Sequence, residues 1–240
     1  MTESYLSFEV KKGARKLVKD IMLVQPGESV VITADTATDR RVVEAVAGAA
    51  HALGAHPVVL YYPTTGKAFE EPALPIAEAV AASDVWIEFA YFCLMHSPCF
   101  RKSLENGTRY TCLTGMDVTM LVNTIAKVDI HTVVEFGEYL KAKVAQTDEV
   151  VVRDANGTQL TAYNRGRRVK HSGQLATQKG YPVMLAGQVS WCPVEETING
   201  TLVFDAALFP PAELGLLREP VRLTLEAGVV TAIEGGGEAA

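Results

Sequence analysis

The hydrophobic positions change their spacing part-way along the chain. Over residues 1–145, runs with helical spacing alternate with short β-branched runs such as ESVVITAD (28–35) and DVWIEFA (84–90). This alternation predicts a parallel sheet covered by helices that form right-handed crossovers. The predicted strands are 28–35, 56–62, 84–90 and 109–115, and the predicted helices are 8–24, 39–54, 73–83, 117–126 and 130–145.

From about residue 146 a two-residue period replaces the helical one. DEVVVRDANGTQLTAY (148–163) predicts two strands joined at Asn-Gly, and VRLTLEAGVVTAIEG (221–235) predicts a second hairpin about Gly228. Two further strands are predicted, at 182–186 and 200–205.

Together these patterns predict a fold of the α/β class with two domains. The first is a parallel-sheet α/β domain over residues 1–145, and the second is a β-rich α+β domain over residues 146–240. The final residues, AIEGGGEAA (232–240), are typical of a connector to a further segment. We therefore expect the second domain to be truncated at its C-terminal end.

Composition and charge exclude several classes of function. Hydrophobic residues make up 48% and charged residues 21% of the chain, as in ordinary globular proteins. The net charge of −6 argues against non-specific nucleic-acid binding. No segment has the pattern of a signal peptide or a membrane span, no GxGxxG follows the first strand, and the four cysteines lack CxxC spacing. We therefore expect a cytoplasmic protein with no membrane or nucleic-acid partner.

Two of the five histidines are candidates for proton transfer. His96 follows the predicted strand 84–90, at the edge of a parallel sheet where ligands gather, or else it packs among hydrophobic loop residues. His171 lies in the polar stretch RRVKHSGQLATQKG, which is either a binding loop or a solvated connector. No two histidines have the HxH, HxxH or HxxxH spacing of a local metal site.

The segment AGQVSWCPVEETINGTLVFDA (186–206) is dense in reactive side chains. Glu195 and Glu196 are consecutive, so on an extended chain they point to opposite faces and do not bind one ion together. Asn199-Gly200 predicts a tight turn before an alternating strand. The two glutamates are therefore expected on the solvent-facing rim of a hairpin.

Two segments carry a resemblance to a known family. GQVSWCPVEETINGTLVFD (187–205) and, less specifically, GESVVITADTATDRRVVEAVAGAAHALGAHPVVLYYP (27–63) resemble the aminopeptidase T-like metalloenzyme superfamily. The resemblance spans nearly the whole chain and is nearest to the 2,5-dihydroxypyridine 5,6-dioxygenase branch. It implies cleavage of a hydroxylated N-heteroaromatic ring by an enzyme that uses Fe(II) and O₂.

The resemblance also implies roles for particular residues. His96 or His171 would take a phenolic proton, while Gln188, Ser190 and Trp191 would shape the substrate pocket. The iron ligands of the branch, two histidines and an aspartate, lie in the last third of longer chains. This chain is expected to stop before them, as a truncated copy or a natural short form, so no metal ligand is predicted within it.

Two alternative functions remain. In the aminopeptidase branch, a glutamate that ligates a catalytic metal pair stands where this sequence has Gln188. Because a neutral amide is a poor ligand for a divalent metal, a Zn- or Co-dependent aminopeptidase is disfavoured. The second alternative is a metal-free module for ligand binding or oligomerisation. The resemblance further implies a small aromatic substrate and a homo-oligomer.

Overall fold

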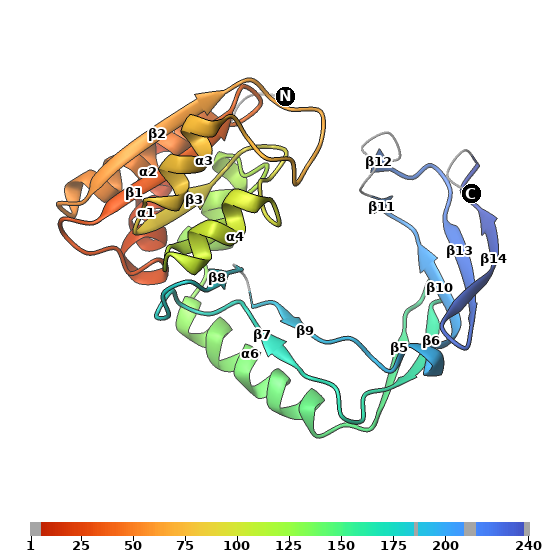
Figure 1. Cartoon of the computed structure of the whole chain (residues 1–240). Coiled ribbons are helices and arrows are strands. Elements are labelled where there is room, and N and C mark those ends of the chain that lie inside the picture. Colours follow the sequence, from red (N-terminus) through yellow and green to blue (C-terminus); the bar gives the residue numbers. More distant parts are fainter. Residues whose placement is uncertain (1–5, 185–186, 209–214, 238–240) are drawn as a thin grey trace. The chain divides into compact units, whose positions relative to one another are not determined.

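The chain contains two compact units, which are described separately below. The computed structural model describes residues 6–184, 187–208 and 215–237 (Figure 1). The first unit comprises the described residues of Met1–Glu138 and His171–Val189, and the second those of Tyr139–Lys170 and Ser190–Ala240. Because a domain is defined by its capacity to fold alone, the predicted domains over 1–145 and 146–240 stay a prediction.

The first unit is built on a parallel sheet of five strands in the order β2-β1-β3-β4-β8. This arrangement confirms the predicted α/β class and the four strands that were predicted within residues 28–115. The strands are β1 (Ser29–Asp35), β2 (His56–Tyr62), β3 (Val85–Glu88), β4 (Arg109–Cys112) and β8 (Pro182–Val183).

The strand β8 corrects one expectation. The sequence pattern grouped residues 182–186 with the β-rich half, but β8 pairs in parallel with β4 through Tyr110 and Thr111. The alternation of short strands alone does not indicate which sheet a strand joins, because parallel pairing depends on distant residues. Residues 185–186 lie outside the described part of the chain.

The predicted helices are confirmed, with shifted ends. Asp39 caps the second of them, since its carboxylate accepts a hydrogen bond from the Arg41 backbone N–H at 3.0 Å. The helices are α1 (Ser7–Lys16), continued by a π turn over Leu17–Ile21, α2 (Arg40–Ala52), α3 (Leu74–Ala81), α4 (Pro98–Glu105), α5 (Val118–Leu121), continued by a π turn over Val122–Ala126, and α6 (Ile130–Ala145). Of these, α4 was not predicted.

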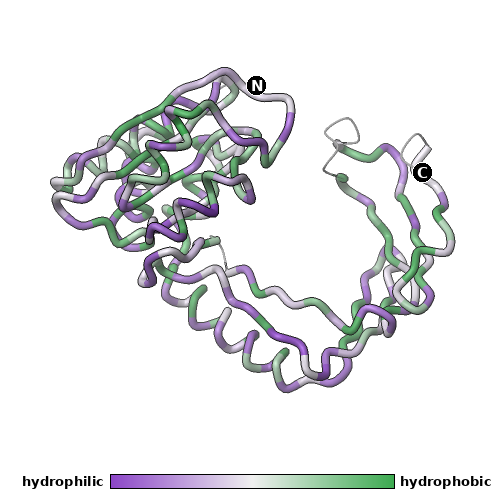
Figure 2. Tube along the Cα trace, in the orientation of Figure 1, coloured by the Kyte–Doolittle hydropathy of each residue, from purple (hydrophilic) through white to green (hydrophobic). Residues whose placement is uncertain are grey.

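Helices cover both faces of the sheet, and successive residues of each strand face opposite layers. Val30 and Ile32 of β1 pack in the larger core with α1, α2 and α5, whereas Val31 packs with α3 and α4. The same alternation places Ile87 in the larger core and Trp86 in the smaller one. Strands buried on both faces become continuous hydrophobic runs, which Figure 2 shows along this sheet.

The second unit is built on an antiparallel sheet in the order β14-β13-β10-β6-β5. Both predicted hairpins are confirmed: one turns at Gly157, with φ +105°, and the other at Ala227 and Gly228, with φ +49° and +78°. Two positive φ values in succession match the twist of a tight hairpin. The strands are β5 (Glu149–Arg153), β6 (Gln159–Tyr163), β10 (Asn199–Phe204), β13 (Val221–Glu226) and β14 (Val229–Gly235).

Two further sheets of two short strands each complete the described strands. They are formed by β11 (Ala207–Leu208) with β12 (Gly215–Leu216), and by β7 (Lys170–His171) with β9 (Val189–Ser190). Among the described residues, no helix has the length and apolar character needed to cross a membrane.

The turn expected at Asn199-Gly200 lies earlier in the chain. Glu195 and Glu196 belong to a 3₁₀ turn over Glu195–Thr197, and Asn199 already begins β10. The glutamates are exposed as expected, although they sit in a turn rather than on an extended rim. Arg167 forms an ion pair with the Glu195 carboxylate.

Gly137 of α6 has no room for a side chain. A Cβ atom there would lie 2.2 Å from Nε2 of the buried His171 ring, whereas a Cβ at Gly48 of α2 would meet nothing within 4 Å. We expect Gly137→Ala to lower the free energy of unfolding by about 1–3 kcal/mol through overpacking. Gly48→Ala should raise it by about 0.5–1 kcal/mol, because alanine favours a helix interior.

Urea denaturation of the two variants beside the wild type measures both changes. Equal effects of the two substitutions would contradict the close packing of His171 on α6.

Candidate functional site

The carboxyl ends of the parallel strands carry the candidate site. In a sheet of order β2-β1-β3-β4, the connections reverse direction between β1 and β3, and ligands of such folds bind near that point. Asp35, the last residue of β1, lies at this point of the sheet. Its carboxylate accepts hydrogen bonds from the backbone N–H groups of Ala37 at 3.1 Å and Tyr91 at 2.9 Å. Asp35 thereby fixes two loops to each other, which is a structural role.

The next strand ends in a fully buried acid. The Glu88 carboxyl accepts a hydrogen bond from the Leu94 backbone N–H at 2.6 Å and another from the Tyr110 hydroxyl. Burial raises the pKa of Glu88 to about 8, and the nearby Cys112 and Asp35 raise it too, whereas the two hydrogen bonds lower it. The buried site therefore favours the protonated form of Glu88 at neutral pH.

Two tyrosines accompany this acid. Burial, with the added effect of Glu88, raises the pKa of both Tyr110 and Tyr62, so both phenols stay protonated at neutral pH. Tyr110 uses its hydroxyl to contact Glu88. The Tyr62 hydroxyl is buried and has no hydrogen-bond partner among the described residues.

Two thiols meet beside the acid. Cys112 ends β4 opposite Glu88 in the sheet register, and Cys93 lies in the loop that follows β3. The Thr114 hydroxyl lies 3.1 Å from the Cys112 sulfur. The hydrogen bond from Cys93 is the main cause that lowers the pKa of Cys112 to about 6, while it raises the pKa of Cys93. Of the two thiols, Cys112 is therefore the one whose surroundings favour the thiolate form.

A cavity of about 310 Å³ adjoins these groups at the end of β4. Its wall combines two hydroxyls, one amide and one thiol with apolar side chains, a mixture typical of small-molecule sites. The lining residues are Cys112, Leu113, Thr114, Met116, Thr124, Met184 and Gln188. The cavity belongs entirely to the first unit. Of the five residues predicted to form the site, only Gln188 is among these lining residues.

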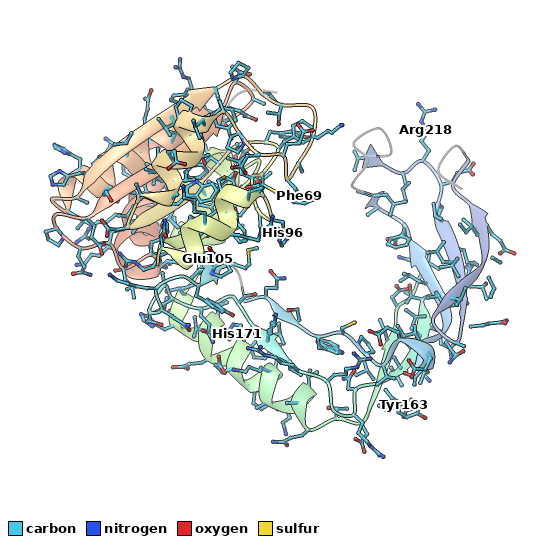
Figure 3. All side chains as sticks on the ribbon, viewed as in Figure 1. Phe69, His96, Glu105, Tyr163, His171 and Arg218 are labelled. Atoms are coloured by element: carbon cyan, nitrogen blue, oxygen red, sulfur yellow. The ribbon has the colours of Figure 1, made fainter. Side chains whose placement is uncertain are left out.

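His96 lies where the sequence predicted it, in an exposed loop after β3. Its backbone has φ +72°, a left-handed conformation that is uncommon for a residue other than glycine. Its ring stands edge-to-face against Phe69 at 5.5 Å and Phe100 at 5.8 Å between centroids, and Figure 3 shows His96 next to Phe69. His96 therefore packs on aromatic rings, as one interpretation of the sequence expected, and it is also exposed, as a role in proton transfer requires.

His171 is buried against α6 instead of lying in an open loop. Its Nδ1 atom is 3.0 Å from a carboxylate oxygen of Glu138, and its side chain is fully buried. The Nε2 atom is buried as well and has no hydrogen-bond partner among the described residues. His171 is therefore positioned by α6 but keeps one ring nitrogen unpaired.

Ser190 and Trp191 belong to the second unit. Ser190 ends β9 and is partly exposed, and the indole Nε1 atom of Trp191 is buried without a partner among the described residues. Their roles as substrate-binding residues stay a prediction, as do those of His96, His171 and Gln188.

The described residues offer no metal centre. They contain no group of three or more His, Cys, Asp or Glu side chains that could hold a metal ion. The cluster at the ends of β3 and β4 offers one carboxyl and two thiols, and each oxygen of that carboxyl accepts a hydrogen bond within the protein. These residues do not fit a metal, and no metal ligand is assigned to them.

Comparison with known families decides the relationship. A model of the 2,5-dihydroxypyridine 5,6-dioxygenase family, NicX, matches residues 16–240. The chain belongs to this family. The resemblance inferred from the sequence is thereby confirmed.

Two solved structures share the fold of this NicX-family chain. The 2,5-dihydroxypyridine dioxygenase of Pseudomonas putida KT2440 is similar with a TM-score of 0.76 and 22% identity, over 98% of this chain and 70% of that one. AmpT from Thermus thermophilus is similar with a TM-score of 0.62 and 16% identity, over 95% of this chain and 71% of that one. A comparison with curated proteins found no match.

The cluster of Glu88, Tyr110, Cys93 and Cys112 was missed by the sequence analysis. One signal was available for Glu88, because an acid inside the apolar run DVWIEFA is costly to bury unless it is protonated or hydrogen-bonded. No local signal joined Cys93 to Cys112, since strand pairing brings them together across 19 positions of sequence.

The raised pKa of Glu88 predicts a pH-dependent stability. The folded protein holds the proton of Glu88 more tightly than the unfolded chain does, so this contribution is fully present below about pH 4.5 and is lost as the pH rises toward about 8. Glu88→Gln keeps the shape but cannot ionise. Across this pH range, the wild type should lose stability relative to Glu88→Gln, measured as urea midpoints. Glu105→Gln, at the exposed end of α4, controls for removal of a surface carboxyl.

The hydrogen bond from Cys93 predicts how Cys112 reacts. Cys93→Ala removes the donor, so the pKa of Cys112 should rise from about 6 toward about 8.5, the value of a free cysteine. Cys93→Ser is the matched control, because its hydroxyl can still donate to the Cys112 sulfur. The pH dependence of Cys112 alkylation by iodoacetamide, followed by peptide mass spectrometry, measures both. An unchanged midpoint in Cys93→Ala would contradict the assignment.

Proposed function

We propose that this chain contributes to the oxygen-dependent cleavage of a hydroxylated N-heteroaromatic ring such as 2,5-dihydroxypyridine. The observation that carries the proposal is the match of the NicX family to residues 16–240. A second support is the cavity at the end of β4, whose volume of about 310 Å³ suits one small ring.

We assign substrate positioning to the cavity wall. The Gln188 amide can both donate to and accept from a ring nitrogen or hydroxyl, and Thr114 and Thr124 add hydroxyl groups to the same wall. Leu113 and Met116 supply apolar contact to the ring faces. Ser190 and Trp191 are also proposed as substrate-binding residues, and the buried indole N–H of Trp191, which has no hydrogen-bond partner among the described residues, supports a donor role.

We assign removal of the phenolic proton to His96. The support is its exposure, together with a left-handed backbone of the kind that persists where the surrounding structure enforces it, often at functional sites. His96 follows β3, and the cavity opens at the end of the neighbouring β4. His171 is the alternative proton acceptor, supported by its Nε2 atom, which has no hydrogen-bond partner within the described part of the chain, although its side chain is fully buried.

The proposed cofactor is Fe(II), as the family resemblance implies, and Zn or Co would serve the aminopeptidase alternative. No ligands for either are assigned among the described residues. A homo-oligomer is likewise proposed from the resemblance, and light scattering of the purified protein measures it.

Ring cleavage by the purified protein tests the proposed function. Protein supplied with Fe(II) and 2,5-dihydroxypyridine in air should bleach the ring absorbance and consume O₂. His96→Ala should lower the rate about 10²–10⁴-fold, the usual contribution of a general base. His56→Ala, which removes an exposed histidine at the start of β2, is the matched control and should retain the wild-type rate.

The alternatives predict different results. Hydrolysis of aminoacyl-nitroanilides with Zn or Co, without ring cleavage, would establish the aminopeptidase function. Absence of both activities, together with no bound metal by elemental analysis, would favour the metal-free module.

A further inference from the structure

The loop between β2 and α3 contacts the proposed proton acceptor through an aromatic ring. Phe69 lies in this loop, and its ring meets the His96 imidazole edge-to-face with 5.5 Å between the ring centroids (Figure 3). His96 belongs to the loop after β3, and β1 separates β2 from β3 in the sheet. The loop after β2 therefore has to pass β1 to make this contact. We call its residues 69–71 the strap.

Two hydrogen bonds fasten the strap to the chain on either side of His96. The Phe69 backbone N–H donates to the Cys93 carbonyl at 2.7 Å, and the Glu71 carboxylate accepts from the Cys99 backbone N–H at 2.9 Å. Cys93 lies three residues before His96, and Cys99 lies three residues after it. The strap is thus held at both ends of the segment that carries the histidine.

Phe69 and His96 share an uncommon backbone conformation. Their φ angles are +70° and +72°, in the left-handed region that bulky residues rarely adopt. Such a conformation persists where the surrounding structure enforces it, and glycine would adopt it at a lower cost. The paired strain points to a use for both rings, because neither position has kept the residue that its backbone favours.

A row of rings supports the opposite side of His96. The imidazole meets the buried Phe100 ring edge-to-face at 5.8 Å between centroids. Phe100 in turn meets Tyr110 at 4.9 Å, and Tyr110 meets Trp86 at 4.6 Å, both fully buried. This side of the imidazole is therefore fixed by the core, whereas Phe69, which is 46% exposed, closes the other side.

We propose that Phe69 is a positioning residue for His96. Its ring, held by the strap, acts with Phe100 to restrict the imidazole to one orientation while His96 stays exposed. A general base must lie within hydrogen-bond reach of the proton it removes, so a fixed ring makes more encounters productive. The consequence for catalysis rests on the proposed function, whereas the orientation of the ring does not.

NMR of the His96 imidazole protons tests the orientation without any turnover. In protein labelled with ¹³C at histidine, the His96 signals are those absent from His96→Gln. Phe69→Leu keeps apolar volume but removes the ring, so these signals should move toward the positions of an exposed histidine. Phe69→Tyr keeps the ring and should retain the wild-type positions. Phe8→Leu, which removes an exposed phenylalanine on α1, is the matched control and should move nothing.

Ring cleavage supplies a second measurement. Phe69→Leu should lower kcat about 10–100-fold with little change in KM, because a small misplacement of a catalytic group can cost this much. Phe69→Tyr should recover most of the rate. In the His96→Ala background the same Phe69→Leu substitution should lower kcat no further, because Phe69 acts through the imidazole.

Three outcomes would overturn the proposal. They are unmoved His96 signals in Phe69→Leu, an equal displacement of the signals in Phe69→Tyr, and a loss of kcat that persists undiminished in the His96→Ala background. A wild-type protein that cleaves no ring would count against the proposed function alone, since the NMR comparison still decides whether Phe69 orients His96.

Discussion

The buried carboxyl of Glu88 constrains the loop and the strand beside the candidate site, at the carboxyl edge of the parallel sheet. A carboxyl with no access to water must be protonated or hydrogen-bonded, and Glu88 satisfies this requirement with the Leu94 N–H and the Tyr110 hydroxyl. The first contact holds the loop after β3, and the second connects β3 to β4. This loop carries Cys93 and His96, so the same carboxyl positions the thiol pair and the proposed proton acceptor.

Much of the scaffold could be predicted from the sequence because it depends on local patterns. The run ESVVITAD defines a strand buried on both faces, and the Asn-Gly of the hairpin at 148–163 requires a positive φ that few residues adopt. Both signals lie within a few residues of the structure they determine. The placement of β8 depends on pairing with a strand about 70 positions away, and no local pattern encodes it.

The candidate site was less predictable for the same reason. Gln188 was named from a family segment and does line the cavity, but the pattern of residues 165–180 gave no indication that His171 would be buried against Gly137. Burial of a histidine in a polar stretch depends on the opposing helix, whose glycine leaves space for the ring. The thiol pair likewise depends on strand register. Sequence reasoning identified single reactive residues, whereas the structure shows which of them are neighbours.

The left-handed backbone at His96 has a consequence for how this protein tolerates change. Glycine reaches φ +72° without the steric penalty that histidine incurs, so His96→Gly relieves backbone strain while it deletes the imidazole. A library selected only for heat resistance would therefore enrich glycine at position 96, whereas the proposed role of His96 as proton acceptor predicts that a library selected for turnover would retain histidine. The preference at this one position would thus report whether a population is being selected for durability or for chemistry.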